Sequence, residues 1–195
     1  MTTLTESVQT ISPPGAFMER VMAATPGETR LEMCIQCGTC GGSCPSGQDM
    51  DHTPRQLFAM IRADMVSEVM TSNTPWYCVS CYFCMVRCPQ EIHIPDIMYA
   101  LKGMAIEANL YKERVAPDLA DSFVGYVENY GRSFEFGLAT RHYLRHQPLK
   151  LLGKAQMGLG MLTKDRLELI PTRIEEIDQL QAILQRAKEI EEAVL

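Results

Sequence analysis

The sequence predicts an all-α protein, and three of its features support that prediction. A capped amphipathic segment lies between two cysteine-rich runs, a second helical segment follows the later run, and the cysteine-free remainder has helical periodicity. No stretch of useful length alternates apolar and polar residues with the period of two that a half-buried strand shows. We therefore expect little or no β-sheet.

Length and composition are those of a small globular protein. The 195 residues suffice for one or two domains, and 46% of them are hydrophobic. The net charge of −6 disfavours nucleic-acid binding. No apolar run reaches the roughly 20 residues that span a bilayer, and residues 1–10 have neither the basic start nor the apolar stretch of an export signal. We expect a cytoplasmic protein without a transmembrane segment, which meets a membrane only through partners.

Two cysteine runs of identical spacing hold all eight cysteines of the chain. Each run reads C-x2-C-x2-C-x3-C-P, which is the spacing of ferredoxins with two [4Fe–4S] clusters. In that pattern the fourth cysteine of each run ligates the cluster of the other run. The expected ligands are Cys34, Cys37, Cys40 and Cys88 for one cluster, and Cys78, Cys81, Cys84 and Cys44 for the second.

Zinc and disulfide bonds are the alternative interpretations of these cysteines. A structural zinc site typically uses two pairs of ligands for one ion, whereas each run here has three evenly spaced cysteines and a fourth before proline. Disulfide bonds belong to oxidising compartments, for which the sequence shows no export signal. Paired [4Fe–4S] clusters therefore remain the favoured interpretation.

Predicted helices flank both runs. A short helix after Pro13 and Pro14 ends before Pro26. Thr53, Pro54 and Gln56 form the capping box of a linker helix that continues to Thr71, and a further helix covers 94–109. The apolar positions of the linker helix share one face: Leu57, Phe58, Ile61, Met65 and Val69. We expect a flexible arm at 1–14 and an α-helical ferredoxin domain at 15–110.

The remainder of the chain, 111–195, predicts a helical extension without ligands. One helix covers 117–130 and ends at Gly131, and an amphipathic terminal helix follows a capping box at 172–175. Between them, glycines and a proline predict only short pieces, at Gly137, Pro148, Gly153 and Gly158.

Basic residues dominate the stretch 132–154. They are Arg132, Arg141, Arg145, Lys150 and Lys154, against Glu135 alone, and His142 and His146 lie among them. Such a stretch is either a solvated face or a docking surface for an acidic partner, because complementary charge steers encounter.

Other residues near the runs suggest an environment for the clusters rather than a catalytic site. The aromatic pairs Trp76-Tyr77 and Tyr82-Phe83 are expected to exclude water. No phosphate-binding glycine loop is present, and no thiol is left for nucleophilic catalysis. We therefore predict no catalytic residue in this chain.

The two runs, the helical linker and the cysteine-free tail together resemble the C subunit of heterodisulfide reductase, from about residue 15 onward. The second run followed by Ile92 to Met98 is especially similar, as is the segment from Asn129 to Glu135. The chain lacks the additional cysteine sets and transmembrane helices of related iron–sulfur subunits.

The resemblance implies a function in electron transfer. The chain would pass electrons between a flavin-bearing, multi-cluster A subunit and a B subunit whose CCG segments hold the catalytic clusters. The substrate would be a heterodisulfide in methanogens, or sulfur in a related bacterial oxidising complex. The moderate Lys and Glu content, without the ion-pair bias of hyperthermophiles, favours a mesophilic bacterium and hence the second of these. Two alternatives stay open: a freely diffusing dicluster ferredoxin, and a scaffold in which the clusters only stabilise the fold.

Overall fold

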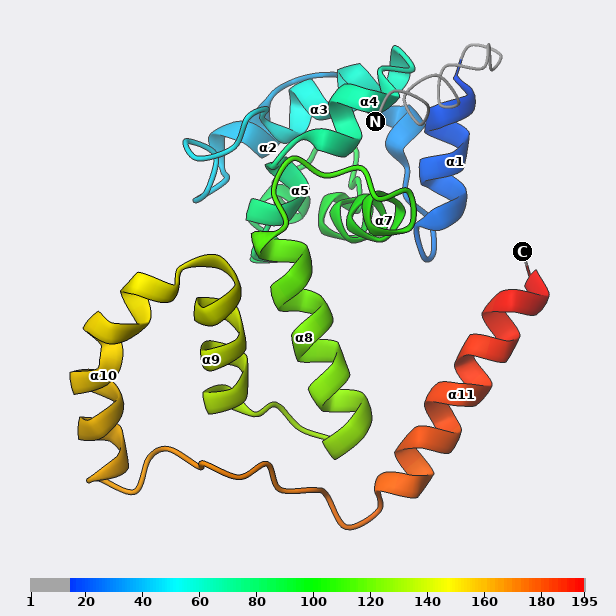
Figure 1. Cartoon of the computed structure of the whole chain (residues 1–195). Coiled ribbons are helices and arrows are strands. Elements are labelled where there is room, and N and C mark those ends of the chain that lie inside the picture. Colours follow the sequence, from blue (N-terminus) through cyan, green and yellow to red (C-terminus); the bar gives the residue numbers. More distant parts are fainter. Residues whose placement is uncertain (1–14, 195) are drawn as a thin grey trace, which may run out of the picture. The chain divides into compact units, whose positions relative to one another are not determined.

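The computed structural model describes residues 15–194, and the arm expected at 1–14 lies outside them. No strand occurs among the described residues, so the prediction of an all-α protein is confirmed. The chain divides into two compact units, 1–112 and 113–195. The first contains α1 (Ala16–Ala24), the 3-10 turn η1 (Leu31–Met33), α2 (Thr39–Gly42), α3 (Pro54–Arg62), α4 (Val66–Thr71), α5 (Thr74–Tyr77), α6 (Phe83–Val86) and α7 (Ile94–Glu107). The second contains α8 (Val115–Tyr130), α9 (Glu135–His146), α10 (Pro148–Leu162) and α11 (Ile177–Val194) (Figure 1).

Helix α7 organises the first unit. It contacts α1, α4, α5 and α6, and α3 packs against α1, α2 and α4. The buried core comes from these elements: Phe17, Val21, Leu31, Leu57, Phe58, Ile61, Val69, Met70, Ile92, Ile94, Ile97, Met98, Leu101 and Ala105. Five of the eight cysteines pack against this core as half-buried side chains: Cys34, Cys40, Cys78, Cys84 and Cys88. The core therefore positions both cysteine runs.

The two runs share one backbone pattern. In each, the residue two positions after the first cysteine is left-handed, Gln36 at φ 60° and Ser80 at φ 53°. The residue after the second cysteine is also left-handed and starts a short helix: Gly38 (φ 83°) precedes α2 and Tyr82 (φ 62°) precedes α6. The repeated spacing thus becomes a repeated conformation, and the two short helices contact each other.

The linker between the runs differs in two places from the expected helix. Its capping box is present, with the Gln56 amide hydrogen bonded to Thr53 Oγ1 at 3.4 Å and the Thr53 amide to Gln56 Oε1 at 2.9 Å. The single helix expected to reach Thr71 is wrong, because α3 ends at Arg62 and α4 begins at Val66. Asp64 is left-handed at φ 55° between them, and its carboxylate accepts hydrogen bonds from the backbone amides of Gly15 and Phe17. The helix is interrupted where this side chain caps α1. The expected stop at 71–75 is also partly wrong, since α5 begins at Thr74.

The second unit is built from longer helices than expected. Helices α8, α9 and α10 contact one another in sequence, and α11 contacts α8. Gly131, left-handed at φ 77°, ends α8 as predicted. Of the expected breaks, only Pro148 separates two helices, because Gly137 lies inside α9 and Gly153 and Gly158 inside α10.

The terminal helix also starts later than the capping box predicted. Helix α11 begins at Ile177, and the segment 172–175 is not helical. Ile174 instead donates its amide to the Tyr130 carbonyl at 3.0 Å and lies where a side chain on Gly131 would be. The segment is therefore held against the end of α8.

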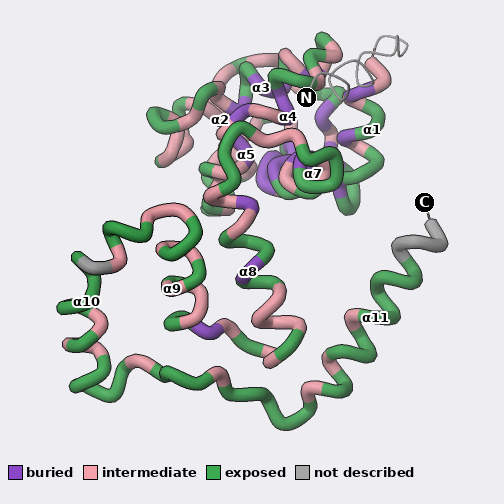
Figure 2. The backbone as a smooth tube through the Cα atoms, viewed as in Figure 1, coloured by how far each residue is buried: buried purple, intermediate pink, exposed green. Residues whose placement is uncertain are grey.

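Burial differs between the two units (Figure 2). Nearly all buried hydrophobic side chains belong to the first unit, and Phe134 is the one that the described part of the second unit contributes. Several large apolar side chains of the second unit are exposed, among them Leu144, Leu149, Leu159 and Ile170. Among the described residues, no helix has the length and apolar character needed to cross a membrane.

Candidate metal centres

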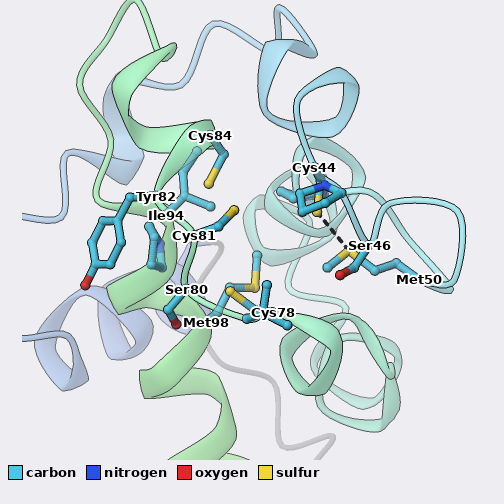
Figure 3. A pocket seen from close by; sticks show the side chains of 14 residues that line it. Cys44, Ser46, Met50, Cys78, Ser80, Cys81, Tyr82, Cys84, Ile94 and Met98 are labelled. Carbon is cyan, nitrogen blue, oxygen red and sulfur yellow. Dashed lines mark hydrogen bonds between the residues drawn. The ribbon is translucent and has the colours of Figure 1, made fainter.

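One pocket of the first unit is lined by four cysteines from both runs, Cys78, Cys81 and Cys84 of the second run and Cys44 of the first (Figure 3). We call it the second site. It holds about 390 Å³ of space between its lining atoms, part of it open to solvent. In Figure 3 the sulfur of Cys44 faces those of the other three cysteines across this space. Met50 and Met98 also line it, and the Cys44 thiol contacts Met50 Sδ at 4.0 Å.

A corresponding pocket, the first site, is lined by the other four cysteines, Cys34, Cys37, Cys40 and Cys88. Its space is similar, about 330 Å³. Arg55 and Gln36 line it together with Phe58, Ile92 and Ile94 of the core. Each pocket therefore combines three cysteines of one run with the last cysteine of the other run.

The fourth cysteine of each run is positioned by a short helix and a turn. The amide of Cys44 is hydrogen bonded to the Gly41 carbonyl in α2, and that of Cys88 to the Met85 carbonyl in α6. Gly41 also allows a close approach, because a Cβ there would lie 3.0 Å from Thr53 Cβ at the start of α3. A glycine at position 41 therefore lets α2 pack directly against the start of α3.

The local environments of the thiols differ. The hydroxyl of Thr39, 3.4 Å from Cys37 Sγ, lowers the pKa of the Cys37 thiol. Burial raises the pKa values of Cys40 and Cys44, and it raises the pKa of Cys84 to about 12. A buried thiolate is unfavourable without a compensating cation. The half-buried thiols therefore favour a bound metal group that takes up their negative charge.

The donor set fits an iron–sulfur cluster. None of the eight cysteines forms a disulfide bond. Each set of four surrounds a space, and among residues 15–194 no group of three or more Cys, His, Asp or Glu side chains could hold a single metal ion. Thiolates spaced around a cavity suit a cluster, whose irons take Cys ligands.

The predicted neighbours of the runs are only partly at the pockets. Of the four aromatic residues, Tyr82 lines the second site, whereas Trp76, Tyr77 and Phe83 line neither pocket. The lining residues that the spacing did not identify include Arg55, Met50 and Met98. They lie outside the runs, Met50 six residues after Cys44 and the other two on α3 and α7, and no local motif marks them.

Comparison with known proteins supports the same chemistry. The profile of the 4Fe-4S dicluster domain matches residues 30–92, which include both cysteine runs. The chain is 38% identical over 164 residues to the C subunit of the H(2):CoB-CoM heterodisulfide,ferredoxin reductase of Methanothermobacter marburgensis, a match that covers 84% of this chain and 79% of that protein. The protein of the same name from Methanothermobacter thermautotrophicus is 37% identical with the same coverage.

A third relative matches over a shorter region. The C subunit of the ferredoxin:CoB-CoM heterodisulfide reductase of Methanosarcina acetivorans is 37% identical over 92 residues, which are 47% of this chain and 37% of that protein. The first two matches span far more than the cysteine runs and therefore extend the similarity into the second unit.

Proposed function

This chain belongs to the family of heterodisulfide reductase C subunits, and we propose that it transfers electrons between two partner subunits of such a reductase. The observation that supports this most directly is the composition of the two pockets. Each combines four thiols, and both lie in one compact unit. A [4Fe–4S] cluster supplies one-electron storage, with a potential set by its protein surroundings.

We propose two clusters with crossed ligands. Cys34, Cys37, Cys40 and Cys88 would hold one, and Cys78, Cys81, Cys84 and Cys44 the other. The pockets support this assignment, because each is lined by one of these sets. Anaerobically reconstituted protein should then contain about eight irons and eight sulfides.

Ligand exchange between the runs can be tested by pairs of serine variants. Cys44→Ser and Cys84→Ser should perturb the same electron paramagnetic resonance signal, although the two cysteines belong to different runs. Cys88→Ser and Cys40→Ser should both perturb the other signal. If Cys44→Ser instead gives the defect of Cys40→Ser, each run holds its own cluster and the crossed assignment is wrong.

The substrate chemistry would belong to a partner. The pockets at the two sites are lined by thiols that we assign to iron, which leaves none of these thiols for attack on a disulfide. We propose that a B subunit with CCG segments binds the substrate, a heterodisulfide or, in a bacterial complex, sulfur. An A subunit with a flavin would be the other electron partner. We also propose a cytoplasmic location, where thiol ligands stay reduced.

The second unit, expected at 111–195 from the sequence, would dock the chain to these partners. Its exposed apolar side chains and small buried core support this role. An open groove in it is lined by Tyr126, Phe136, Leu144 and Leu169, with Arg141 at its wall. No ion pair of Arg141 is found within the described chain, so its charge is available for an acidic segment of a partner.

Arg145, which also lines the groove, is already used inside the unit. Its Nε lies 3.1 Å from Asp118 Oδ2, which is also 3.2 Å from His146 Nε2. A substitution of Arg145 would therefore disturb the unit itself. Arg141 is the better probe of docking.

Co-purification of the full-length chain tests the docking proposal. Arg141→Glu should weaken association with the B-type partner, and more strongly at low salt than at high salt. Lys164→Glu, the same charge change at an exposed residue of the second unit outside both the groove and the stretch 132–154, is the matched control. Equal association of the two variants would place the docking surface elsewhere. A chain that elutes alone from a native extract would instead favour a diffusing ferredoxin.

A further inference from the structure

The two candidate sites have the same backbone but different side chains at equivalent positions. Between the first and third cysteines, Gln36, Gly38 and Thr39 of one run correspond to Ser80, Tyr82 and Phe83 of the other. The φ angles of Gln36 and Ser80 are similar, and both Gly38 and Tyr82 are left-handed with ψ near 0°. Within the two runs, the differences between the sites therefore lie mainly in these side chains.

The first site has side-chain donors to its sulfur atoms. Gln36 donates from Nε2 to Cys34 Sγ at 3.4 Å. Thr39 Oγ1 lies 3.4 Å from Cys37 Sγ. When Cys37 is a metal-bound thiolate it has no proton, so the Thr39 hydroxyl must be the donor.

A cation also lies at the first site. Arg55 on α3 lines this pocket, and its Cδ and Nε are 3.5 and 3.7 Å from the position that a Cβ on Gly38 would occupy. A side chain at position 38 would therefore crowd the aliphatic part of Arg55. The glycine allows the left-handed start of α2 and also leaves room for this arginine.

The second site lacks these features. Ser80 donates to the Tyr99 hydroxyl at 2.9 Å instead of to a sulfur, and Phe83 has no donor to offer. In the described part of the chain, no hydroxyl, amide or guanidinium side chain is hydrogen bonded to the sulfur of Cys44, Cys78, Cys81 or Cys84.

A lysine that contacts the second run is directed to other groups. The Lys102 ammonium donates to the Cys78 carbonyl at 3.4 Å and lies 4.8 Å from the centre of the Tyr99 ring. Lys102 does not line the pocket, whose longer side chains include the thioethers of Met50 and Met98. The second site is therefore the less polar of the two.

We propose that the first site has the higher reduction potential, and that Gln36, Thr39 and Arg55 set the difference. Reduction adds negative charge to a cluster and its sulfur ligands, and hydrogen-bond donors and a nearby cation stabilise that charge. The apolar side chains around the second site do not stabilise this added charge. Within the proposed electron-transfer function, on which this inference rests, an electron shared between the two clusters would reside mainly on the cluster at the first site.

A redox titration of the anaerobic holoprotein, followed by electron paramagnetic resonance, tests this order. The wild-type chain should show two one-electron couples. Thr39→Val removes the hydroxyl at nearly constant volume. It should lower the equilibrium constant for reduction of the higher-potential couple about tenfold, which is a fall of about 59 mV in its midpoint potential, and leave the other couple unchanged. Arg55→Gln should shift the same couple in the same direction, whereas Arg55→Lys should retain most of the wild-type value.

The reciprocal change and a matched control complete the test. Phe83→Thr, at an exposed position of the second run, should raise the lower-potential couple alone. Arg20→Gln removes the same charge from an exposed residue that lines neither pocket and should shift neither couple. If Thr39→Val or Arg55→Gln moves the lower couple, the order of potentials is reversed and the inference is wrong. Two reversible couples would still support electron transfer in that case, whereas the absence of any reversible couple would overturn the proposed function as well.

Discussion

Asp64 provides a quantitative test of how the first unit is held together. Its Oδ2 and Oδ1 accept hydrogen bonds from the amides of Gly15 and Phe17 at 2.6 and 3.0 Å, across 49 and 47 residues of sequence. Gly15 is the N-cap residue of α1 and Phe17 lies in its first turn, where backbone donors have no partner within the helix. The residue itself is left-handed at φ 55°. The side chain therefore caps one helix from the loop between two others.

The cost of Asp64→Ala has two parts. Loss of a capping side chain costs roughly 1–2 kcal/mol. Alanine in the left-handed conformation costs about 1 kcal/mol more than aspartate, whose side chain tolerates it. The sum is about 2–3 kcal/mol. In a unit of about 100 residues, 1 kcal/mol corresponds to roughly 4–8 °C, so we expect the unfolding midpoint to fall by about 8–24 °C.

Two companion substitutions separate the parts. Asp64→Gly keeps the left-handed backbone and loses only the cap, so it should cost about 1–2 kcal/mol. Asp64→Asn keeps both the conformation and one acceptor oxygen, so it should cost about 1 kcal/mol. The measurement is circular dichroism of the anaerobic holoprotein at one fixed heating rate, because loss of the metal makes the midpoint rate-dependent. An Asp64→Gly midpoint equal to that of the wild type would refute the capping argument.

The remaining predictions concern glycines and the metal. Gly137→Ala should lower the unfolding midpoint, because a Cβ there would collide with the ring of Phe134 and the hydroxyl of Tyr126. Gly153→Ala, at a helical glycine with open space around it, should instead stabilise α10 by about 0.5–1 kcal/mol, and urea titration distinguishes the two. Gly131→Ala should also be destabilising, since it combines a positive φ with a clash against Ile174. Removal of iron by a chelator should abolish cooperative unfolding of the first unit, monitored by circular dichroism, because the crossed ligands would join its two halves.

The spacing of the cysteines contained most of what could be predicted. Eight cysteines in two identical runs predicted the cluster chemistry, and the capping box at Thr53 and Gln56 predicted the start of α3. These signals are local, so the sequence alone is sufficient to find them. The family resemblance, now confirmed, rested on segments that flank the runs as well as on the runs themselves.

The errors arose where distant residues decide the local structure. The break at Asp64 depends on its bonds to residues 47 and 49 positions away, which no periodicity in the linker indicates. Gly137 looked like a helix breaker, but it is required inside α9 because Phe134 and Tyr126 occupy the space of its missing side chain. The residues at 172–175 have the sequence of a capping box, but no helix starts there. The hydrogen bond from the Ile174 amide to the Tyr130 carbonyl holds this segment against the end of α8 instead.

The repeat within the first unit explains how one spacing can serve two different sites. Formation of each pocket depends on the backbone, since left-handed residues and a short helix direct three cysteines of a run to one space and its fourth to the other. The positions between the cysteines are then free to vary without moving the ligands. The exception is the left-handed position before each short helix, which favours glycine. Glycine occupies it in the first run, and Tyr82 occupies it in the second although a bulky side chain rarely adopts this conformation. Side chains at these positions can therefore give two clusters different potentials without moving their ligands.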